Sequence, residues 1–395
     1  MWSEPADLLL VAASARAIAE SAVRGGFRVW VLDGFCDLDT QALGPCTRVP
    51  LVDLGAGWGL EPRCLRAALR DLAAEGADLG LVYGSGLEST PEALTSLPAG
   101  LRLLGNDPAV LSLLKDPQQF CALLDGLAIA HPRTLLDPPP ADAPGRWLVK
   151  ACGGCGGLGV GPWRTGDPRP VAPHLFQRFQ EGDLRSVLFI ADGREFKVIG
   201  CNRLLVADAD PRRPFLYGGA IGQAALSDPA RSVVAHWCRA LVGALGLRGL
   251  NNLDFILHEG QPYLLDINPR PSATMSLYEG QCEGGWIRRH ARACLGDLSG
   301  EPPRRAAQVA GQRVVYATDA LTIPAVGRWP DWSRDRPAAG TRIARGAPLC
   351  TVLAQGADAD RVESMLAARS EEVREYVSTG VREERIHAAR RIPPY

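Results

Sequence analysis

The sequence lacks a strong net charge, a long apolar run and a regular cysteine framework. Its 43 basic and 44 acidic residues give a formal net charge of -1, so no overall field favours nucleic acid or an anionic membrane, and we expect neither as a partner. No apolar run approaches the roughly 20 residues that span a bilayer. Its 11 cysteines are odd in number and irregularly spaced, which indicates reduced thiols rather than a secreted disulfide scaffold. We therefore expect a cytoplasmic protein.

The sequence also lacks the glycine pattern of a dinucleotide site. An apolar run over residues 7–14 precedes helical spacing over 15–27 and a second apolar run over 28–35, which predicts a β-α-β unit. The first turn reads "AASARA" instead of G-x-G-x-x-G, so Asp33 at the end of the second strand does not indicate a nicotinamide or flavin site. A further strand over 78–86 ends in a glycine loop, which favours a parallel, doubly wound sheet.

The length of 395 residues is too great for one ordinary core, so we expect several domains. Helical spacing over 101–134 leads into a proline-rich linker over 136–145, and alternating strands and a helix over 228–249 follow. The fold class that we predict is α/β followed by α+β, with a small strand-rich module at the C-terminal end. The boundaries that we expect are 1–100, 101–300 and 301–395, with the middle part divided into 101–145, 146–182 and 183–300.

The stretch "WLVKACGGCGGLGV", residues 147–160, has two interpretations. Cys152 and Cys155 form a Cys-x-x-Cys pair, but no second pair with zinc-ligand spacing occurs, and the six histidines show none either. Lys150 at the end of a strand, followed by glycines, offers a positive charge and a flexible backbone that can fold over a phosphate. The pattern differs from a P-loop, because no Gly-Lys-Ser/Thr follows.

A second motif, "LLDINPRPS", places an acidic group and an amide on one strand. Asp266 and Asn268 are two residues apart and therefore face the same side, and Asp254 lies on the preceding strand. Two carboxylates and an amide oxygen are ligands suited to Mg²⁺. Arg270 follows as a fork for a phosphoryl oxygen. The alternative is that Asp266 and Asn268 satisfy turn amides before Pro269.

The order of these elements over about residues 106–273 resembles the ATP-grasp superfamily. The resemblance implies ATP and Mg²⁺, with Mn²⁺ as a substitute, and it implies the following roles. Lys115 and Lys150 would bind ATP phosphates under the loop of Gly153, Gly154, Gly156 and Gly157. Gln177, Arg178, Phe179 and Gln180 would lie along the adenine, with Asp183 as the candidate for the ribose. Asp254, Asp266 and Asn268 would hold the metal, and Arg270 and Lys150 would act in phosphoryl transfer.

Two positions depart from the family pattern. The hinge reads "FQRFQEGD" where a glutamate often stands first, which leaves the ribose-binding residue in question. The second metal carboxylate, Asp266, is an aspartate where glutamate is more common, so its reach is shorter.

The whole chain is similar to ATP-grasp ligases of the tyramine-glutamate ligase type, from methanofuran- and tetrahydromethanopterin-linked one-carbon metabolism. The resemblance rests on "LLLVAASARAIAESAVRGGF", "YGSGLES" and "LLGNDPAVLSLLKDPQQF". It implies that glutamate is joined to an amine through an acyl phosphate, with ADP and phosphate released. Three alternative interpretations stay open. They are a ligase for another acid and amine, of purine or polyglutamate type, a Cys-x-x-Cys redox or zinc protein, and a nucleotide-binding sensor. The partners that we expect are a small-molecule acid and amine, and a homodimer is among the assemblies this reading allows.

Overall fold

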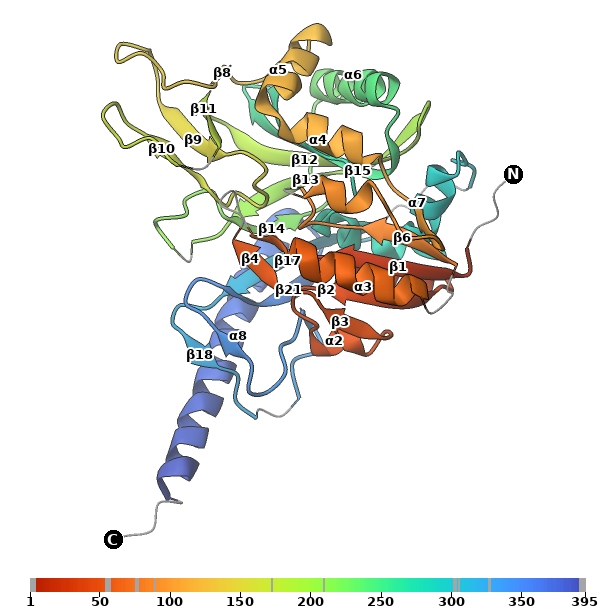
Figure 1. The fold of residues 1–395 in the computed structure, drawn as a ribbon. Coiled ribbons are helices and arrows are strands. Elements are labelled where there is room, and N and C mark those ends of the chain that lie inside the picture. Colours follow the sequence, from red (N-terminus) through yellow and green to blue (C-terminus); the bar gives the residue numbers. More distant parts are fainter. Residues whose placement is uncertain are drawn as a thin grey trace.

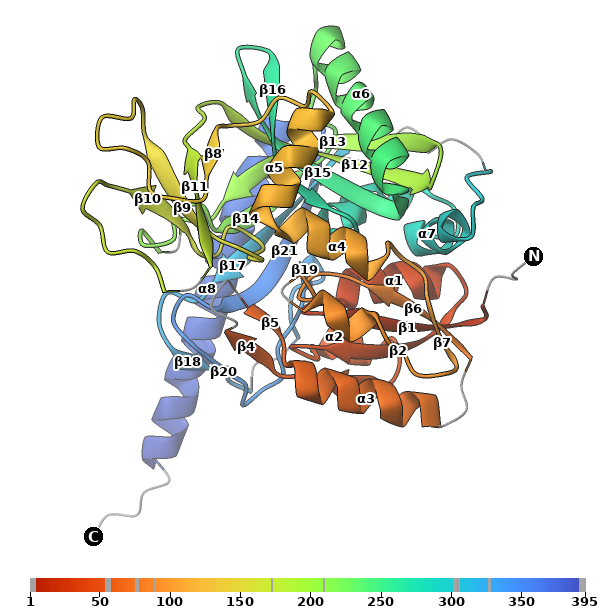
Figure 2. The ribbon, with the colours of Figure 1, turned by 45° about the horizontal axis from the view of Figure 1, so that its top comes forward.

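The computed structural model describes residues 5–390 apart from 54–57, 75–77, 89, 172, 209, 301–303, 305 and 326–327. The outermost residues of the first and last expected domains therefore lie outside the described part. Figures 1 and 2 show the N-terminal sheet below a large antiparallel sheet, a small sheet standing to one side, and a long C-terminal helix that extends beyond the body of the protein. Within the described residues, no helix is long and apolar enough to cross a membrane.

The N-terminal sheet is parallel, as the alternating apolar runs predicted. Its strand order is β3-β2-β1-β6-β7, and all four pairings are parallel. Its strands are β1 (Asp7–Ala12), β2 (Arg28–Asp33), β3 (Cys46–Arg48), β6 (Leu79–Tyr83) and β7 (Leu101–Leu103). Its helices are α1 (Arg16–Arg24), α2 (Leu38–Gln41) and α3 (Pro62–Ala74), and a short hairpin joins β4 (Leu51–Asp53) to β5 (Trp58–Leu60). The order reverses beside β1, where such sheets bind ligands at the strand ends.

The helical region expected over 101–134 is divided into two helices. These are α4 (Pro108–Lys115) and α5 (Pro117–Gly126), whereas the first residues of the region form strand β7, and the short 3-10 helix η1 (Pro91–Leu94) lies before it. Asp116 is extended, and its carboxylate accepts a hydrogen bond from the backbone N–H of Gln119 as the N-cap of α5. Pro117 then fits the first position of the new helix, where no N–H is needed. Lys115 consequently lies at the C-terminal end of α4.

A small antiparallel sheet follows the proline-rich linker. Its order is β10-β9-β11-β8, with β8 (Thr134–Leu135), β9 (Trp147–Ala151), β10 (Val160–Trp163) and β11 (His174–Arg178). The glycine-rich loop joins β9 to β10, so its two ends are held by antiparallel pairing of Lys150 with Val160. The loop is therefore a hairpin tip on the small sheet, which lies apart from the N-terminal sheet in Figure 2.

The large sheet has eight strands in the order β16-β15-β12-β13-β14-β17-β21-β19. The strands are β12 (Asp183–Asp192), β13 (Phe196–Val206), β14 (Tyr217–Ile221), β15 (Arg248–His258), β16 (Gln261–Asn268), β17 (Val309–Tyr316), β19 (Ser333–Arg334) and β21 (Pro348–Gly356). The antiparallel pairing of β12 with β13, and of β15 with β16, agrees with the strands and turns that the sequence predicted. Helix α6 (Asp228–Leu245) packs Trp237 and Leu241 into the core that it forms with this sheet.

The C-terminal segment is strand-rich, as expected, and three of its strands, β17, β21 and β19, complete the large sheet. β17 pairs with β14 and β21 pairs with β17, and α8 (Ala359–Arg390) buries Val362 and Leu366 against them. A separate small pair, β18 (Leu321–Thr322) with β20 (Arg342–Ile343), lies in the loops between them. The 3-10 helix η2 (Ala273–Gln281) and α7 (Trp286–Cys294) pack against α1 and so join the large sheet to the N-terminal one.

Candidate active site

The β15–β16 hairpin carries a pair of facing carboxylates. Asp254 and Asp266 are register partners on the two strands. The side-chain amides of Asn252 and Asn268 donate hydrogen bonds to the two oxygens of Asp254, at 2.7 and 3.1 Å. Burial, and then the neighbouring Asp266 charge, raise the pKa of Asp254 to about 7. The hairpin thus concentrates negative charge in a place with little solvent.

Lys115 reaches this hairpin from the end of α4. Its Nζ lies 3.1 Å from one oxygen of Asp266 and 3.2 Å from the other, and only 11% of its side chain is exposed. Burial lowers the pKa of Lys115, but the charges of Asp266 and Glu88 outweigh it, and the net pKa is raised. Lys115 is therefore a fixed positive charge beside the carboxylate pair.

Arg270 is held by a residue that the sequence motifs did not single out. Its Nε donates to Oε1 of Glu88 at 2.7 Å, and its Nη2 donates to Oδ1 of Asn268 at 3.0 Å. The exposed fractions of the Arg270 and Glu88 side chains are 9% and 5%. Glu88 follows β6 in the loop "YGSGLES". Parallel sheets bind ligands at the edge where their strands end, so this position was the signal from which Glu88 could have been predicted as a site residue.

Lys150 points from β9 toward the adjacent strand β11. Its Nζ donates to Oε1 of Gln177 at 2.5 Å, and the Gln177 amide donates to the Thr134 hydroxyl at 3.1 Å. Burial lowers the pKa of Lys150 to about 8, although the charge of Asp266 acts in the opposite direction. Lys150 and Lys115 therefore approach Asp266 from two different subdomains.

The glycine-rich loop adopts a backbone that other residues rarely adopt. Gly157 has a φ of +73°, and a Cβ placed on it would lie 1.8 Å from the carbonyl oxygen of Phe215. Gly153 and Gly156 also have positive φ values. The carbonyl of Gly156 accepts a hydrogen bond from the Tyr217 N–H at 2.8 Å, so the loop rests on the start of β14. Gly154 lies in the same loop.

The remaining hinge residues lie around the end of β11. Phe179 is covered by the guanidinium of Arg146 at 4.1 Å from its ring centroid, and Gln180 donates to the Glu181 carbonyl at 3.2 Å. Arg178 is the exposed last residue of β11. Asp183 is 67% exposed and accepts a hydrogen bond from Arg185 at 2.9 Å. The structure thus brings Gln177 to Lys150, whereas Asp183 is paired on the surface.

The cysteines of the glycine loop lack the lowered thiol pKa that a reactive redox pair needs. Burial raises the pKa of Cys155 to about 12 and also raises the pKa of Cys152, so both thiols stay protonated. In the described part of the chain, no three His, Cys, Asp or Glu side chains form a metal-binding group. The zinc or dithiol interpretation has no support in this geometry.

A family model described as an ATP-grasp domain matches residues 116–274. The chain has the ATP-grasp fold. It is similar to the L-amino acid ligase from Bacillus licheniformis at 15% identity, with a TM-score of 0.68 and coverage of 94% of this chain and 98% of that chain. It is also similar to N5-carboxyaminoimidazole ribonucleotide synthetase from Thermus thermophilus, at 16% identity, a TM-score of 0.66, and coverage of 92% and 98%.

A biotin carboxylase domain dimer of Hydrogenobacter thermophilus 2-oxoglutarate carboxylase, solved with MgADP and bicarbonate, is a third similar structure. Its identity is 14% and its TM-score 0.68, with coverage of 90% of this chain and 87% of that chain. The ATP-grasp fold confirms the predicted fold class, with its N-terminal parallel sheet and split α+β core.

The residues of the β15–β16 hairpin fit a divalent cation. Asp254 and Asp266 provide hard oxygen donors, and burial, followed by the neighbouring Asp266 charge, raises the pKa of Asp254. A bound cation would offset both effects. Asn268 has its amide nitrogen directed at Asp254 and its oxygen at Arg270. The side-chain oxygens of Asp254 and Asp266 are therefore the donors best placed for the metal, and Asn268 would need to turn to join them.

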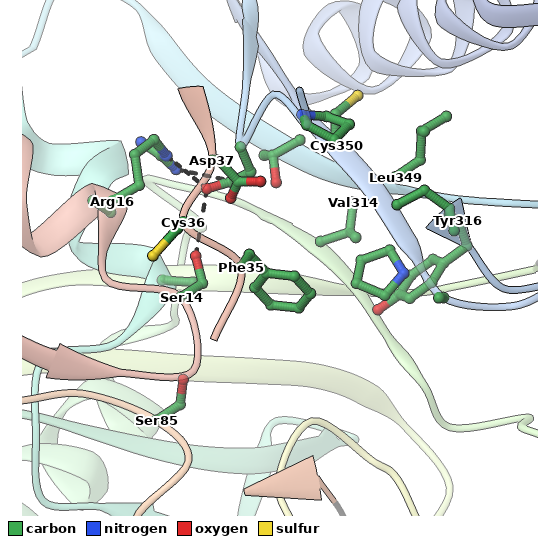
Figure 3. Close-up of a pocket in the computed structure, with 18 of the residues that line it drawn as sticks. Ser14, Arg16, Phe35, Cys36, Asp37, Ser85, Val314, Tyr316, Leu349 and Cys350 are labelled. Atoms are coloured by element: carbon green, nitrogen blue, oxygen red, sulfur yellow. Dashed lines mark hydrogen bonds and ion pairs between the residues drawn. The ribbon is translucent and has the colours of Figure 1, made fainter. Parts of the chain in front are cut away.

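A cavity of about 470 Å³ adjoins the end of the β15–β16 hairpin. Arg270 and Ser272 line it from the end of β16, Ser14 and Asp37 from the ends of the N-terminal strands, and Tyr316 from β17. Figure 3 shows Ser14, Arg16 and Asp37 on one side of the cavity, with Val314, Leu349 and Tyr316 opposite. The cavity therefore connects the topological switch point of the first domain to the residue expected to face phosphate.

Proposed function

We propose that this chain is an ATP- and Mg²⁺-dependent ligase that joins a carboxylate to an amine through an acyl phosphate. The observation that carries the proposal is the convergence of Lys115 on Asp266, at 3.1 Å, beside the Glu88-anchored Arg270. Cationic and anionic groups from three parts of the chain meet there, and a cavity large enough for a small molecule opens beside them.

The chain's own groups would act by position and charge. Lys115 and Lys150 would neutralise ATP phosphates, and the hairpin tip of Gly153, Gly154, Gly156 and Gly157 would cover them. Arg270, aimed by Glu88, would face the phosphoryl group as it passes to the substrate carboxylate. Asp254, Asp266 and Asn268 would hold Mg²⁺, which supplies charge neutralisation for the phosphates when bound. Gln177 to Gln180 would contact the adenine, and Asp183 is the candidate for the ribose.

The acid and amine are proposed from the resemblance of the sequence motifs. The similarity to tyramine-glutamate ligases favours glutamate as the acid, in a one-carbon cofactor pathway of the methanofuran type. The L-amino acid ligase among the similar structures favours a second candidate, an amino acid acceptor. A screen of ADP release with glutamate against amines, amino acids and pterin-type acids separates them, since each candidate requires a different acid-amine pair.

The decisive variant is Asp266→Ala combined with Asn268→Ala. We expect it to abolish ADP release and to remove tight Mn²⁺ binding, which electron paramagnetic resonance measures without any turnover. The matched control is His258→Ala with Gln261→Ala, a facing pair at the far end of the same hairpin. Full activity in the first double variant would overturn the metal assignment, and an equal loss in the control would show a folding defect instead.

The cysteine alternative has its own test. Cys152→Ser with Cys155→Ser removes both thiols and keeps residues of similar size in the loop. A ligase should retain most of its ATP-dependent turnover, because neither thiol is ionised. Complete loss of turnover, with ATP binding intact, would favour a thiol mechanism.

A further inference from the structure

The Pro269 carbonyl, between Asn268 and Arg270, accepts hydrogen bonds from two side chains at the ends of the N-terminal parallel strands. The Asn106 amide nitrogen donates to it at 2.8 Å, and the Tyr83 hydroxyl lies 3.2 Å from it. Tyr83 is 1% exposed and Asn106 is 2% exposed. Neither residue lines the cavity beside Arg270, and neither belongs to the nucleotide site proposed above. Their contact with the segment that carries Arg270 therefore needs its own explanation.

The side-chain amide of Asn106 has one orientation that satisfies its neighbours. Its Oδ1 accepts a hydrogen bond from the Arg248 N–H at 2.7 Å, so the other end of the amide must be the nitrogen. The two nearest acceptors of that nitrogen are the Pro269 carbonyl at 2.8 Å and Oδ1 of Asn251 at 2.9 Å. Its two hydrogens are used there, and the start of β15 keeps the donor directed at Pro269.

Tyr83, the last residue of β6, brings a second donor to the same place. Its hydroxyl lies 3.1 Å from the Asn106 carbonyl as well as 3.2 Å from the Pro269 carbonyl. Burial raises the pKa of Tyr83 well above its ordinary value, so the hydroxyl keeps the proton that it donates. Gly105 leaves room for the ring, because a Cβ on Gly105 would lie 2.6 Å from Cε1 of Tyr83. The ends of β6 and β7 thus present two buried donors to one carbonyl.

This carbonyl determines where Arg270 begins. The C=O of Pro269 and the N–H of Arg270 belong to one planar peptide unit. The N–H donates to the Asn268 carbonyl at 2.9 Å, so both polar groups of the unit have partners. Glu88 binds the far end of the Arg270 side chain. The N-terminal part of the chain therefore contacts Arg270 at two levels, through its guanidinium and through the backbone before it.

We infer that Tyr83 and Asn106 are positioning residues, which hold Arg270 in place for phosphoryl transfer through the Pro269 carbonyl. The effect on catalysis rests on the proposed function, whereas the effect on the position of Arg270 does not. A displacement of about 1 Å in a group that orients the reacting atoms can cost roughly 100-fold in rate. Nucleotide binding uses other side chains, so its affinity should change little.

The first measurement detects the environment of Arg270 without any nucleotide. In whole protein carrying ¹⁵N-labelled arginine, the Nε–Hε cross-peak of Arg270 is identified as the one that disappears in Arg270→Lys. We expect Tyr83→Phe, which removes only a hydroxyl, to shift this cross-peak. The matched control is Ser21→Ala, because the buried Ser21 hydroxyl also joins the two sheets, by accepting from the Ile287 N–H at 3.0 Å. The control should leave the cross-peak in place.

The second measurement is ADP release from MgATP, with glutamate or whichever acid and amine of the screen above supports turnover. Asn106→Asp keeps the oxygen that accepts from Arg248 and replaces the donor at Pro269 with a second oxygen. We expect it to lower kcat by roughly tenfold or more, and Tyr83→Phe to lower kcat by about threefold or more. The KM for ATP should change less than about twofold, a split that a general loss of structure does not produce.

Two outcomes overturn the inference. An unchanged Arg270 cross-peak in Tyr83→Phe, or the same shift in Ser21→Ala, would mean that the hydroxyl does not hold Arg270. A shifted cross-peak with unchanged kcat in both variants would remove the positioning role, and thermal melting shows that the variants are folded. Failure of the proposed function is distinguishable, because the wild type would then release no ADP while the cross-peak still reports the contact with Tyr83.

Discussion

Glu88 and Arg270 form an ion pair across 182 residues of sequence, with Nε of the arginine 2.7 Å from Oε1 of the glutamate. Glu88 follows β6 of the N-terminal sheet, and Arg270 follows β16 of the large sheet. The pair therefore links the two domains and aims the guanidinium at the cavity, which Arg270 also lines.

Removing Glu88 should cost stability, because a buried arginine would be left without its counter-charge. We expect Glu88→Ala to lower the free energy of unfolding by about 3 kcal/mol in urea denaturation. The control is Glu283→Ala, whose pair with Arg304 is exposed on both sides and should contribute less than about 1 kcal/mol. Equal effects of the two substitutions would contradict the structural role of Glu88.

Gly157 should not tolerate a side chain. Gly157→Ala combines a φ of +73° with a Cβ 1.8 Å from the Phe215 oxygen, so the loop must move. The cost of such strain, roughly 1–3 kcal/mol, corresponds to a loss of about 5- to 150-fold in ATP affinity measured by calorimetry. Gly161→Ala is the matched control, because no atom lies within 4 Å of its added Cβ. Unchanged ATP affinity in Gly157→Ala would mean that the loop does not need this conformation.

Asp37 should make the stability of the protein depend on pH. Burial and the charges of Asp335, Asp33 and Asp39 raise its pKa to about 8 in the fold, so the folded state takes up a proton that the unfolded chain releases near pH 4. The stabilisation that comes from protonated Asp37 is fully present below about pH 4 and is lost as the pH rises through 8. We expect Asp37→Asn to be more stable than the wild type at pH 9, by on the order of a few kcal/mol, and nearly equal at pH 4. Urea denaturation at both pH values measures this, and parallel curves would contradict it.

Cys36 and Cys46 should form a disulfide under mild oxidation. Their sulfur atoms lie 2.8 Å apart, and the hydrogen bond from Cys46 lowers the pKa of Cys36. With oxidised glutathione, the Cys36 thiolate would displace one glutathione thiol and Cys46 the second, so that two glutathione molecules are released. We expect non-reducing peptide mapping to recover the linked peptides, while Cys155, with its raised pKa, stays reduced. Recovery of both thiols unmodified would refute this prediction.

Local sequence patterns predicted much of this architecture. Apolar runs over residues 7–14 and 28–35 became the paired strands β1 and β2, because strands buried on both faces leave a continuous apolar signal. The two-residue spacing in "DINPR" placed Asp266 and Asn268 on one face of β16, since side chains alternate along a strand. The division of the helical region at Asp116 was missed, because its signal was one capping aspartate before Pro117.

What the sequence by itself determined was the order of strands and helices, the ATP-grasp motifs and the residue types around Lys150 and Asp266, because each depends on neighbours a few positions away. Only the tertiary structure decided the pairing of Glu88 with Arg270, the contact of Arg16 with Asp335 across 319 residues, and the isolation of Asp37 in a cavity. These features arise where segments distant in the sequence meet, and no local periodicity reports which charges will be buried together or which will be left without a partner.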